Sequence, residues 1–121
     1  MNKTVEVNID EKKYVVKFPN VGQTLDIESM KMSLTGNKYP ELVMSPLKTT
    51  EFAADLVDAI ATFFVMIPEL RGNLNVKSYS ELDVMSGAKL IKAYLTDYYP
   101  FYKDIMTEVY KFQKDGSKTE E

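Results

Sequence analysis

Near residue 20 the hydrophobic period of the chain changes from two to about 3.6, and no other feature constrains the fold as strongly. In residues 4–18, apolar and polar residues alternate on both sides of the polar stretch DEKK. Alternation around a short polar loop is typical of a β-hairpin, and Asp10 favours a type I turn in that loop. Pro19 and Gly22 end the second strand, and a helical period follows. The chain is therefore expected to have an α+β fold.

The second strand of the predicted hairpin has an apolar face and a mixed face, made up respectively of Tyr14, Val16 and Phe18 and of Val15 and Lys17. A two-stranded hairpin alone is marginally stable in water, so its apolar face needs a covering layer. We expect a helix over residues 23–35, stopped by Gly36, to fold back over that face. The outer edges of the hairpin keep unpaired backbone groups, which suit strand addition by a neighbouring molecule.

Helical periodicity continues through the rest of the chain. Helices are predicted at residues 23–35, 50–67, 81–98 and 100–113, with Pro100 breaking or kinking the chain between the last two. The segment 50–67 is expected to supply the centre of the core of a single domain over residues 1–112, through Leu56, Ile60, Phe63 and Ile67. Residues 113–121 are polar and are predicted to form a flexible tail.

The net charge of the 121-residue chain, −3, argues against a nucleic-acid-binding protein. Such proteins need a basic surface to displace counterions from phosphates, and Arg71 is the single arginine available for bidentate contacts. The most apolar stretch, residues 59–67, is nine residues long, whereas a membrane helix needs about twenty. The N-terminus alternates in polarity and predicts no signal peptide. We therefore expect neither nucleic acid nor membrane as a partner.

The residue types that perform much of enzyme catalysis are missing. The chain contains no His and no Cys, which excludes nucleophile pairs and zinc sites built on those side chains. It also has no Gly-rich phosphate loop. Glu51, Asp55 and Asp58 share one helix face, where they either bind Mg²⁺ or Ca²⁺ or form the solvated side. The second interpretation is favoured, since three helical carboxylates supply no ligand loop. No enzyme activity and no cofactor are expected.

Contacts with other proteins are the activity that the composition favours. The sequence YYPFY gathers four aromatic rings in five residues, and aromatic side chains are strong interface anchors. These rings either fill the core beside Pro100 or contact a partner, and both alternatives stay open. Arg71 is interpreted as a solvated loop residue rather than as an anchor. The candidate partner-binding residues are Val15, Lys17, Tyr98, Tyr99, Phe101 and Tyr102.

Three stretches of the chain, KFPNVGQTLDIESMKMSLTGNKY, DAIATFFVMIPEL and LIKAYLTDYYPFYKDI, resemble small proteins from the structural and tail-assembly modules of tailed bacteriophages. Some of these proteins are described as tail assembly chaperones. The resemblance covers residues 14–105 and implies a non-enzymatic assembly or structural protein that contacts itself or other phage structural proteins, with a homo-oligomer as one form. It also implies a location in the cytoplasm of the infected bacterial host or in the virion. A small regulatory or adaptor module that binds a host or phage protein is the alternative.

Overall fold

The structure of the protein, a computed structural model, describes the backbone of residues 3–119 and the side chains of residues 3–115. Its N-terminal element is an antiparallel hairpin of β1 (Thr4–Ile9) and β2 (Lys12–Lys17). The helices that follow are α1 (Val21–Leu34), α2 (Tyr39–Met44), α3 (Lys48–Met66), α4 (Leu70–Asn73), α5 (Val84–Ala93) and α6 (Tyr99–Thr119). A 3₁₀ turn, η1 (Tyr79–Glu81), precedes α5, and a π-helical turn, η2 (Tyr94–Tyr98), joins α5 to α6. This order of elements confirms the α+β class.

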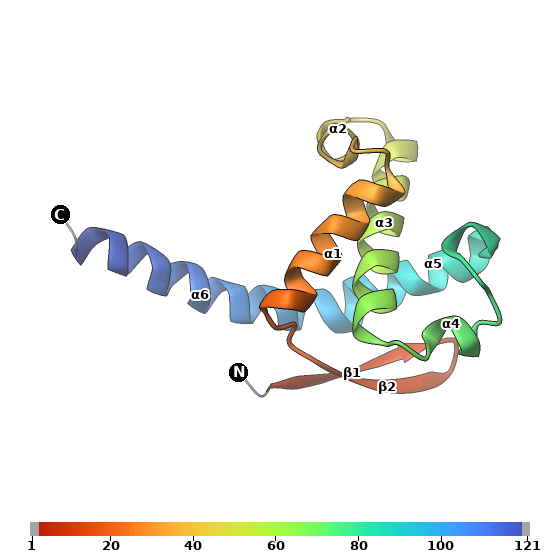
Figure 1. The fold of residues 1–121 in the computed structure, drawn as a ribbon, viewed down its shortest axis with the longest axis horizontal. Helices are drawn as coiled ribbons and strands as arrows, with labels where there is room; N and C mark the ends of the chain where they lie inside the picture. The colour runs from red at the N-terminus through yellow and green to blue at the C-terminus, as the bar shows by residue number, and fades with distance from the viewer. Residues whose placement is uncertain (1–2, 120–121) are drawn as a thin grey trace.

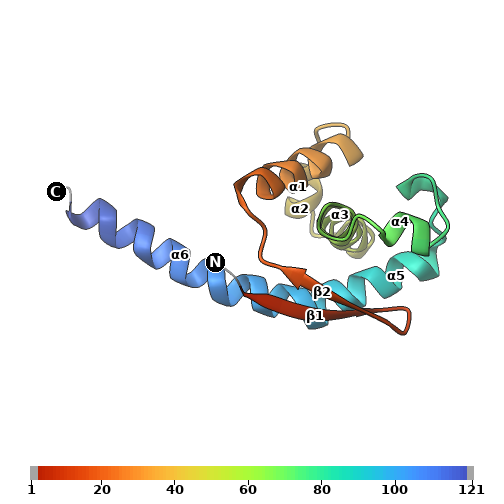
Figure 2. The ribbon, with the colours of Figure 1, turned by 60° about the horizontal axis from the view of Figure 1, so that its bottom comes forward.

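The elements form a body with one long projection. Helix α3 stands at the centre of the body, with α1 alongside it and α2 at its N-terminal end (Figure 1). Helix α5, the turn η2 and helix α6 run on as one rod past α1 and α3, and the hairpin lies along this rod (Figures 1 and 2). In both views the C-terminal half of α6 extends past every other element. The rod therefore has a packed half and a projecting half.

The two strands are joined by a two-residue turn. Asp10 and Glu11 have φ angles of 51° and 69°, so both residues lie in the left-handed region. This geometry is that of a type I′ turn. The prediction of a type I turn is wrong, because the twist of a type I′ turn matches the right-handed twist of the strands that it joins. The extent of the hairpin, predicted as residues 4–18, is confirmed to within one residue, and Val7 lies opposite Tyr14.

Helix α1 begins two residues earlier than predicted because the preceding link supplies its cap. The side chain of Asn20 accepts a hydrogen bond from the backbone N–H of Gln23 at 2.8 Å, and the backbone N–H of Asn20 donates to Gln23 Oε1 at 3.1 Å. This capping box satisfies two donors at the start of the helix. Gly36 follows the helix with a φ angle of 59°, a left-handed conformation that glycine adopts without strain. The predicted stop at Gly36 is confirmed.

The core lies where the inner face of the hairpin meets α3, α4 and the rod. Its members are almost fully buried: Val7, Ile9, Tyr14, Val16, Ala59, Ile60, Phe63, Ile67, Leu70, Leu90, Ala93, Tyr94 and Tyr98. The predicted core residues Ile60, Phe63 and Ile67 are therefore confirmed. Leu56 is only partly buried, because it lies at the edge of this cluster against Gly87. A Cβ atom on Gly87 would lie 2.8 Å from Leu56 Cδ1, so the glycine permits this close approach of α5 to α3.

Pro100 does not break the helical rod. Inside a regular α-helix, a proline ring clashes with the carbonyl group four residues back and removes one hydrogen bond. Here the backbone N–H of Tyr99 bonds the carbonyl of Tyr94, five residues back, and this wider π turn accommodates the proline. The predicted helices at 81–98 and 100–113 are therefore parts of one continuous rod.

The helical C-terminal region is longer than predicted. Helix α6 continues to Thr119, six residues past the predicted helix end at residue 113, and the flexibility expected for residues 113–121 stays a prediction. Residues 120 and 121 lie outside the described residues. Once a helix is nucleated, each further residue adds a hydrogen bond, so the helix continues although Asp115, Gly116 and Ser117 are weak helix formers. A stretch that has the composition of a polar tail thus prolongs the rod.

Candidate functional site

The most exposed aromatic side chains of the rod lie near its C-terminal end. Close to the body, Ile105 is buried, and Phe18 stacks on Tyr102 with ring centroids 5.4 Å apart. Further along α6, Tyr110 is 61% exposed and Phe112 is 81% exposed. We call residues 107–119, the part of α6 that extends beyond the body, the arm.

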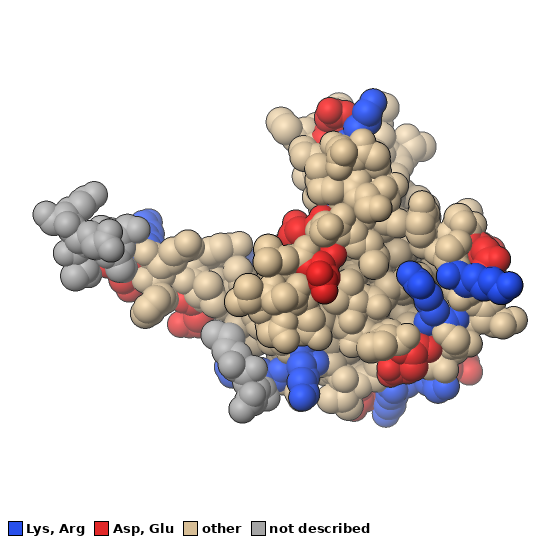
Figure 3. All heavy atoms as spheres, in the orientation of Figure 1, with Lys and Arg blue, Asp and Glu red and all other residues tan. Residues whose placement is uncertain are grey.

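The arm continues an apolar face that begins in the core. At about 3.6 residues per turn, one half of the circumference of α6 collects its large apolar side chains: Phe101, Tyr102, Ile105, Met106, Val109, Tyr110 and Phe112. The first members of this face pack against the body, whereas the last ones are exposed. Figure 3 shows largely uncharged surface along α6, with Asp and Glu side chains along its lower edge. Exposed apolar surface of this kind marks contact sites.

The charges of α6 are segregated on the two sides of its apolar face. By helical position there is a basic flank of Lys103 and Lys114 beside Tyr110, and an acidic flank of Asp104, Glu108 and Asp115 beside Phe112. Lys111 lies at a helical position between these two flanks, on the side opposite to the apolar face. The arm therefore offers an apolar face with a basic flank on one side and an acidic flank on the other.

The two predicted contact residues of the hairpin lie on its outer face. Val15 is 72% exposed, and Lys17 is also exposed. On β1, the backbone N–H of Asn8 donates to Asp97 Oδ2 at 2.9 Å, so this strand faces the rod. The backbone of β2 makes, within the described part of the chain, only the ladder bonds to β1. This open edge is short and carries three lysines, and edge lysines discourage strand addition.

The aromatic cluster YYPFY is divided between the core and the surface. Tyr98 is 1% exposed and packs edge-on against a ring of α3, so its prediction as a partner-binding residue is wrong. The rod lies directly against α3 at this position, and Tyr98 fills the contact. Phe101 and Tyr102 are half-buried and pack on Phe18. Tyr99 is 42% exposed, and a large part of its ring is accessible to a partner.

An apolar groove lies at the end of the body that is opposite to the hairpin. Its volume is about 400 Å³. It is formed by the C-terminal end of α1, by α2, by α3 and by η1, and its lining is mostly apolar: Leu34, Thr35, Lys38, Leu42, Ala53, Leu56, Val57, Ile60 and Tyr79. Ligand pockets of this size usually have several polar groups that fix the orientation of the ligand. The lining of this groove suits apolar side chains of another protein better.

A second hollow, of about 360 Å³, lies beside the groove and is acidic. Leu42 of α2 lines both hollows, and the carboxylates Glu51, Asp55 and Asp58 line the acidic one. Burial raises the pKa of Asp55, and the neighbouring charges of Asp58 and Glu51 raise it further. Among the described residues, no group of three or more His, Cys, Asp or Glu side chains is arranged to hold a metal ion. The hollow is therefore a place where negative charges repel one another.

Asp58 is the member of this cluster that is tied to the other helices. It accepts a hydrogen bond from the Tyr39 hydroxyl, and its Oδ1 atom lies 3.5 Å from Lys31 Nζ. Lys31 also pairs with Glu28 at 2.9 Å and lies over the ring of Tyr39. These contacts join α1, α2 and α3 at one point. They neutralise Asp58 and leave the carboxylate of Asp55 to interact with other groups.

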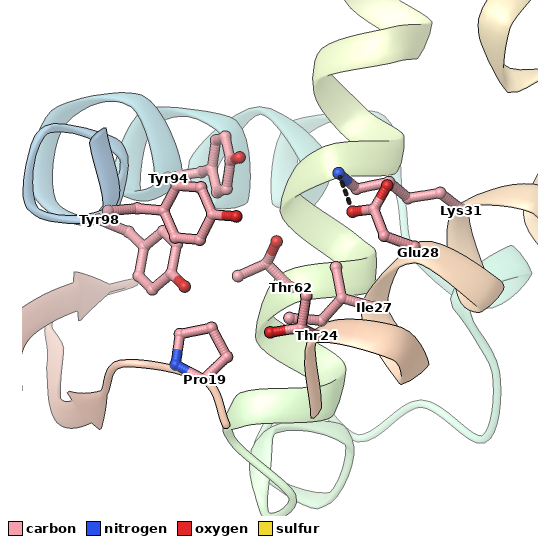
Figure 4. A pocket seen from close by; sticks show the side chains of 9 residues that line it. Pro19, Thr24, Ile27, Glu28, Lys31, Thr62, Tyr94 and Tyr98 are labelled. Atoms are coloured by element: carbon pink, nitrogen blue, oxygen red, sulfur yellow. Dashed lines mark ion pairs between the residues drawn. The ribbon is translucent and has the colours of Figure 1, made fainter. Parts of the chain in front are cut away.

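A small cavity of about 40 Å³ lies where α1, α3 and η2 meet (Figure 4). Tyr94 and Tyr98 line it, and the Tyr98 hydroxyl has no hydrogen-bond partner within the part of the chain that the structure describes. Burial raises the pKa of both phenols far above their usual value, so both stay protonated at neutral pH and do not act as bases. The volume admits a few water molecules, each of which needs about 10–15 Å³. It is too small for an organic substrate.

The single arginine of the chain, Arg71, packs on its own molecule. Arg71 lies in α4 rather than in a loop, and its guanidinium lies 5.4 Å from the ring centroid of Phe64. Its side chain is thus exposed but packs on its own molecule.

Within residues 3–119, no helix combines the length and the apolar character that crossing a membrane requires.

Comparisons with known proteins leave the family open. No family model matches the chain, and searches of curated proteins and of solved structures found no match. The phage resemblance of the sequence therefore stays a prediction. The function has to be inferred from the arm, the groove and the acidic hollow.

Proposed function

We propose that this protein is a non-enzymatic assembly or structural protein of a tailed bacteriophage, similar to a tail assembly chaperone or a virion component. It acts through protein–protein contacts, in the cytoplasm of the infected bacterium or in the virion. The observation that supports contact as its activity is the arm, whose apolar face is exposed and ends in Phe112. The assignment to a phage comes from the sequence resemblance.

The arm has few stabilising contacts within its own molecule. The arm is the end of the continuous 21-residue helix α6, but it extends away from the body (Figure 2), and its side chains Tyr110 and Phe112 stay exposed. Burial of an aromatic side chain removes roughly 150–250 Å² from water, so docking Tyr110 and Phe112 on a partner stabilises the arm strongly. An extended apolar helix face therefore favours binding over catalysis as the activity.

Sedimentation velocity of the wild-type chain over a range of concentrations tests this proposal. We expect oligomers, and we expect Phe112→Asp to weaken their association roughly tenfold or more, as loss of an interface anchor does. Thr107→Asp is the matched control, because it places the same charge on the polar side of the same helix. Circular dichroism checks that both variants are folded. A wild-type chain that stays monomeric and binds no phage protein contradicts the proposal, as does normal assembly of Phe112→Asp.

The apolar groove favours a second candidate, a small adaptor module that binds a host or phage protein. A groove of about 400 Å³ is large enough to receive side chains of a foreign helix. This candidate predicts a monomer that forms a complex of fixed composition when mixed with infected-cell lysate. Oligomers of the pure chain favour the assembly protein instead.

Mass spectrometry of purified virions separates the two forms of the main proposal. A virion component is present at a fixed copy number, whereas an assembly chaperone is absent from the mature particle.

A further inference from the structure

We propose that the open edge of β2 binds an extended, acidic segment of another protein, which adds to the hairpin as a third strand. This inference deepens the proposed function and rests on it, because it states the chemistry of one protein partner. The residues of β2 that receive the segment are Lys13, Val15 and Lys17.

The backbone groups of these three residues point away from β1. In an antiparallel pair, residues whose N–H and C=O groups bond the partner strand alternate with residues whose groups point outward. The backbone N–H of Asn8 donates to Asp97 Oδ2 rather than to β2, and Lys13 lies opposite Asn8. The backbone groups of Lys13 therefore point outward, and by alternation those of Val15 and Lys17 do so too.

These outward groups have no hydrogen-bond partner within the described part of the chain. The other edge of the hairpin, that of β1, lies against the rod at Asn8, so the rod occupies the place of an added strand there. The hairpin itself lies at the lower border of the body in Figure 1. A two-stranded sheet gains stability from a third strand, and a strand added at β2 makes up to about six main-chain hydrogen bonds with the three outward residues.

The side chains along this edge favour an acidic partner. Lys13, Val15 and Lys17 alternate with buried residues, so their side chains share the exposed face of the hairpin. Residues of an added strand that lie directly opposite them place their side chains on the same face, roughly 4.5–5.5 Å away. Lys17 has no ion pair among the described residues, and the pair of Lys13 with Glu6, at 3.4 Å, is exposed. Acidic residues opposite the two lysines thus gain ion pairs, and an apolar residue between them covers Val15, which is 72% exposed.

The same lysines disfavour a second copy of the hairpin as the added strand. If two β2 edges pair antiparallel with the fullest overlap, Lys13 of each copy lies opposite Lys17 of the other. Like charges directly opposite each other destabilise a sheet, which is one reason why edge lysines discourage strand addition. A strand with acidic side chains meets attraction instead of repulsion. The edge therefore selects its partner by charge.

Fluorescence anisotropy with two short labelled peptides tests the part played by charge. In the first peptide glutamate alternates with valine, and in the second lysine replaces every glutamate. We expect the full chain to bind the glutamate peptide and to bind the lysine peptide at least about tenfold more weakly. The double variant Lys13→Glu/Lys17→Glu should reverse this preference, with circular dichroism as the check that it is folded.

Val15→Pro tests strand addition separately from charge. Proline removes the outward N–H of this residue, which β1 does not use, and proline is tolerated on an edge strand where that N–H faces solvent. We expect the variant to stay folded and to bind the glutamate peptide at least about tenfold more weakly than the wild type. Val15→Thr is the matched control, because it keeps the N–H and should bind like the wild type. If Val15→Pro does not fold, hydrogen exchange of the wild type replaces it, and the bound peptide should slow exchange at the amides of Lys13, Val15 and Lys17.

Binding of the glutamate peptide that needs both the lysines and the N–H of Val15 supports the inference. Equal binding by the wild type and Val15→Pro, or exchange that does not slow, would show attraction to negative charge alone, as a nucleic acid also provides, and overturns it. Equal affinity for the two peptides, or no binding of either, overturns it as well. None of these results affects oligomer formation through Phe112, which sedimentation measures independently. The inference can therefore fail while the proposed function holds.

Discussion

At the scale of single residues, Glu11 stands out because its conformation is unfavourable for its side chain. Its φ angle of 69° lies in the left-handed region, which costs an L-residue roughly 1–2 kcal/mol. Glycine avoids this cost, and Asp-Gly is a preferred pair for a type I′ turn. We predict that Glu11→Gly raises the free energy of unfolding by about 0.5–1 kcal/mol in urea titration. Lys12→Gly, one residue further in β2, is the control and should destabilise the protein.

Tyr98 is the second residue whose contribution to stability can be tested directly, through its hydroxyl group. It is buried without a hydrogen-bond partner among the described residues, and burying such a group costs about 1–3 kcal/mol. Tyr98→Phe keeps the ring that packs on Phe63 and removes the hydroxyl. We predict that the variant is as stable as the wild type or more stable by up to about 1 kcal/mol. A clear loss of stability in thermal and urea unfolding would show that the hydroxyl is hydrogen-bonded in solution.

At the scale of elements, the contact between α3 and the rod depends most on Phe63. This side chain is fully buried and meets the rings of Tyr94 and Tyr98 edge-on, at 6.1 Å and 5.9 Å. Phe63→Ala leaves a cavity between α3 and η2, and we predict a loss of about 3–5 kcal/mol in the free energy of unfolding. Phe52→Ala, on an exposed position of the same helix, should cost far less. Similar losses for both variants would mean that α3 does not pack as described.

The acidic face of α3 predicts a pH dependence of stability. The pKa of Asp55 is raised by burial and by the charges of Asp58 and Glu51, so the folded state binds a proton more readily than the unfolded state. Stability from this group is therefore lost as pH rises from the usual value of 3.8 through the folded-state pKa. We predict that Asp55→Asn is more stable than the wild type at neutral pH, by about 0.2–0.5 kcal/mol for each relieved like-charge pair. This advantage should vanish below pH 3.8 in parallel urea titrations.

The sequence predicts the elements better than it predicts their ends. Hydrophobic periodicity located the hairpin and the central helix, because burial of one face requires apolar residues at regular spacing along the element. The cap of α1 is also encoded locally, because Asn20 and Gln23 stand three residues apart. The π turn was not predictable, because Pro100 is equally typical of a break. Whether Tyr98 or Tyr99 is buried depends on how the rod is rotated against α3. Helical periodicity alone does not determine this rotation.

The groove and the acidic hollow belong to the scale of the whole molecule. They arise where segments far apart in the sequence meet, and no local pattern joins Leu42 to Tyr79 before the chain is folded. The carboxylates of the hollow were visible as a helix face, and so was the apolar stripe of the last helix. The sequence did not show that this stripe extends beyond the body. The length of the projecting part depends on where the hairpin and α1 end in space (Figure 2).

The π turn at Tyr94–Tyr98 has a consequence for the evolution of the arm. It holds one residue more than an α-helical turn, and each residue of a helix advances the direction of its side chains by about 100°. Losing a single residue there would swing the entire arm around its own axis while leaving its composition untouched. Phe112 would then point to a different side of the body. Two related chains with identical arm sequences can therefore differ in the geometry of their assemblies. The deletion of one codon in the π turn, far from the contact surface, is enough to cause the difference.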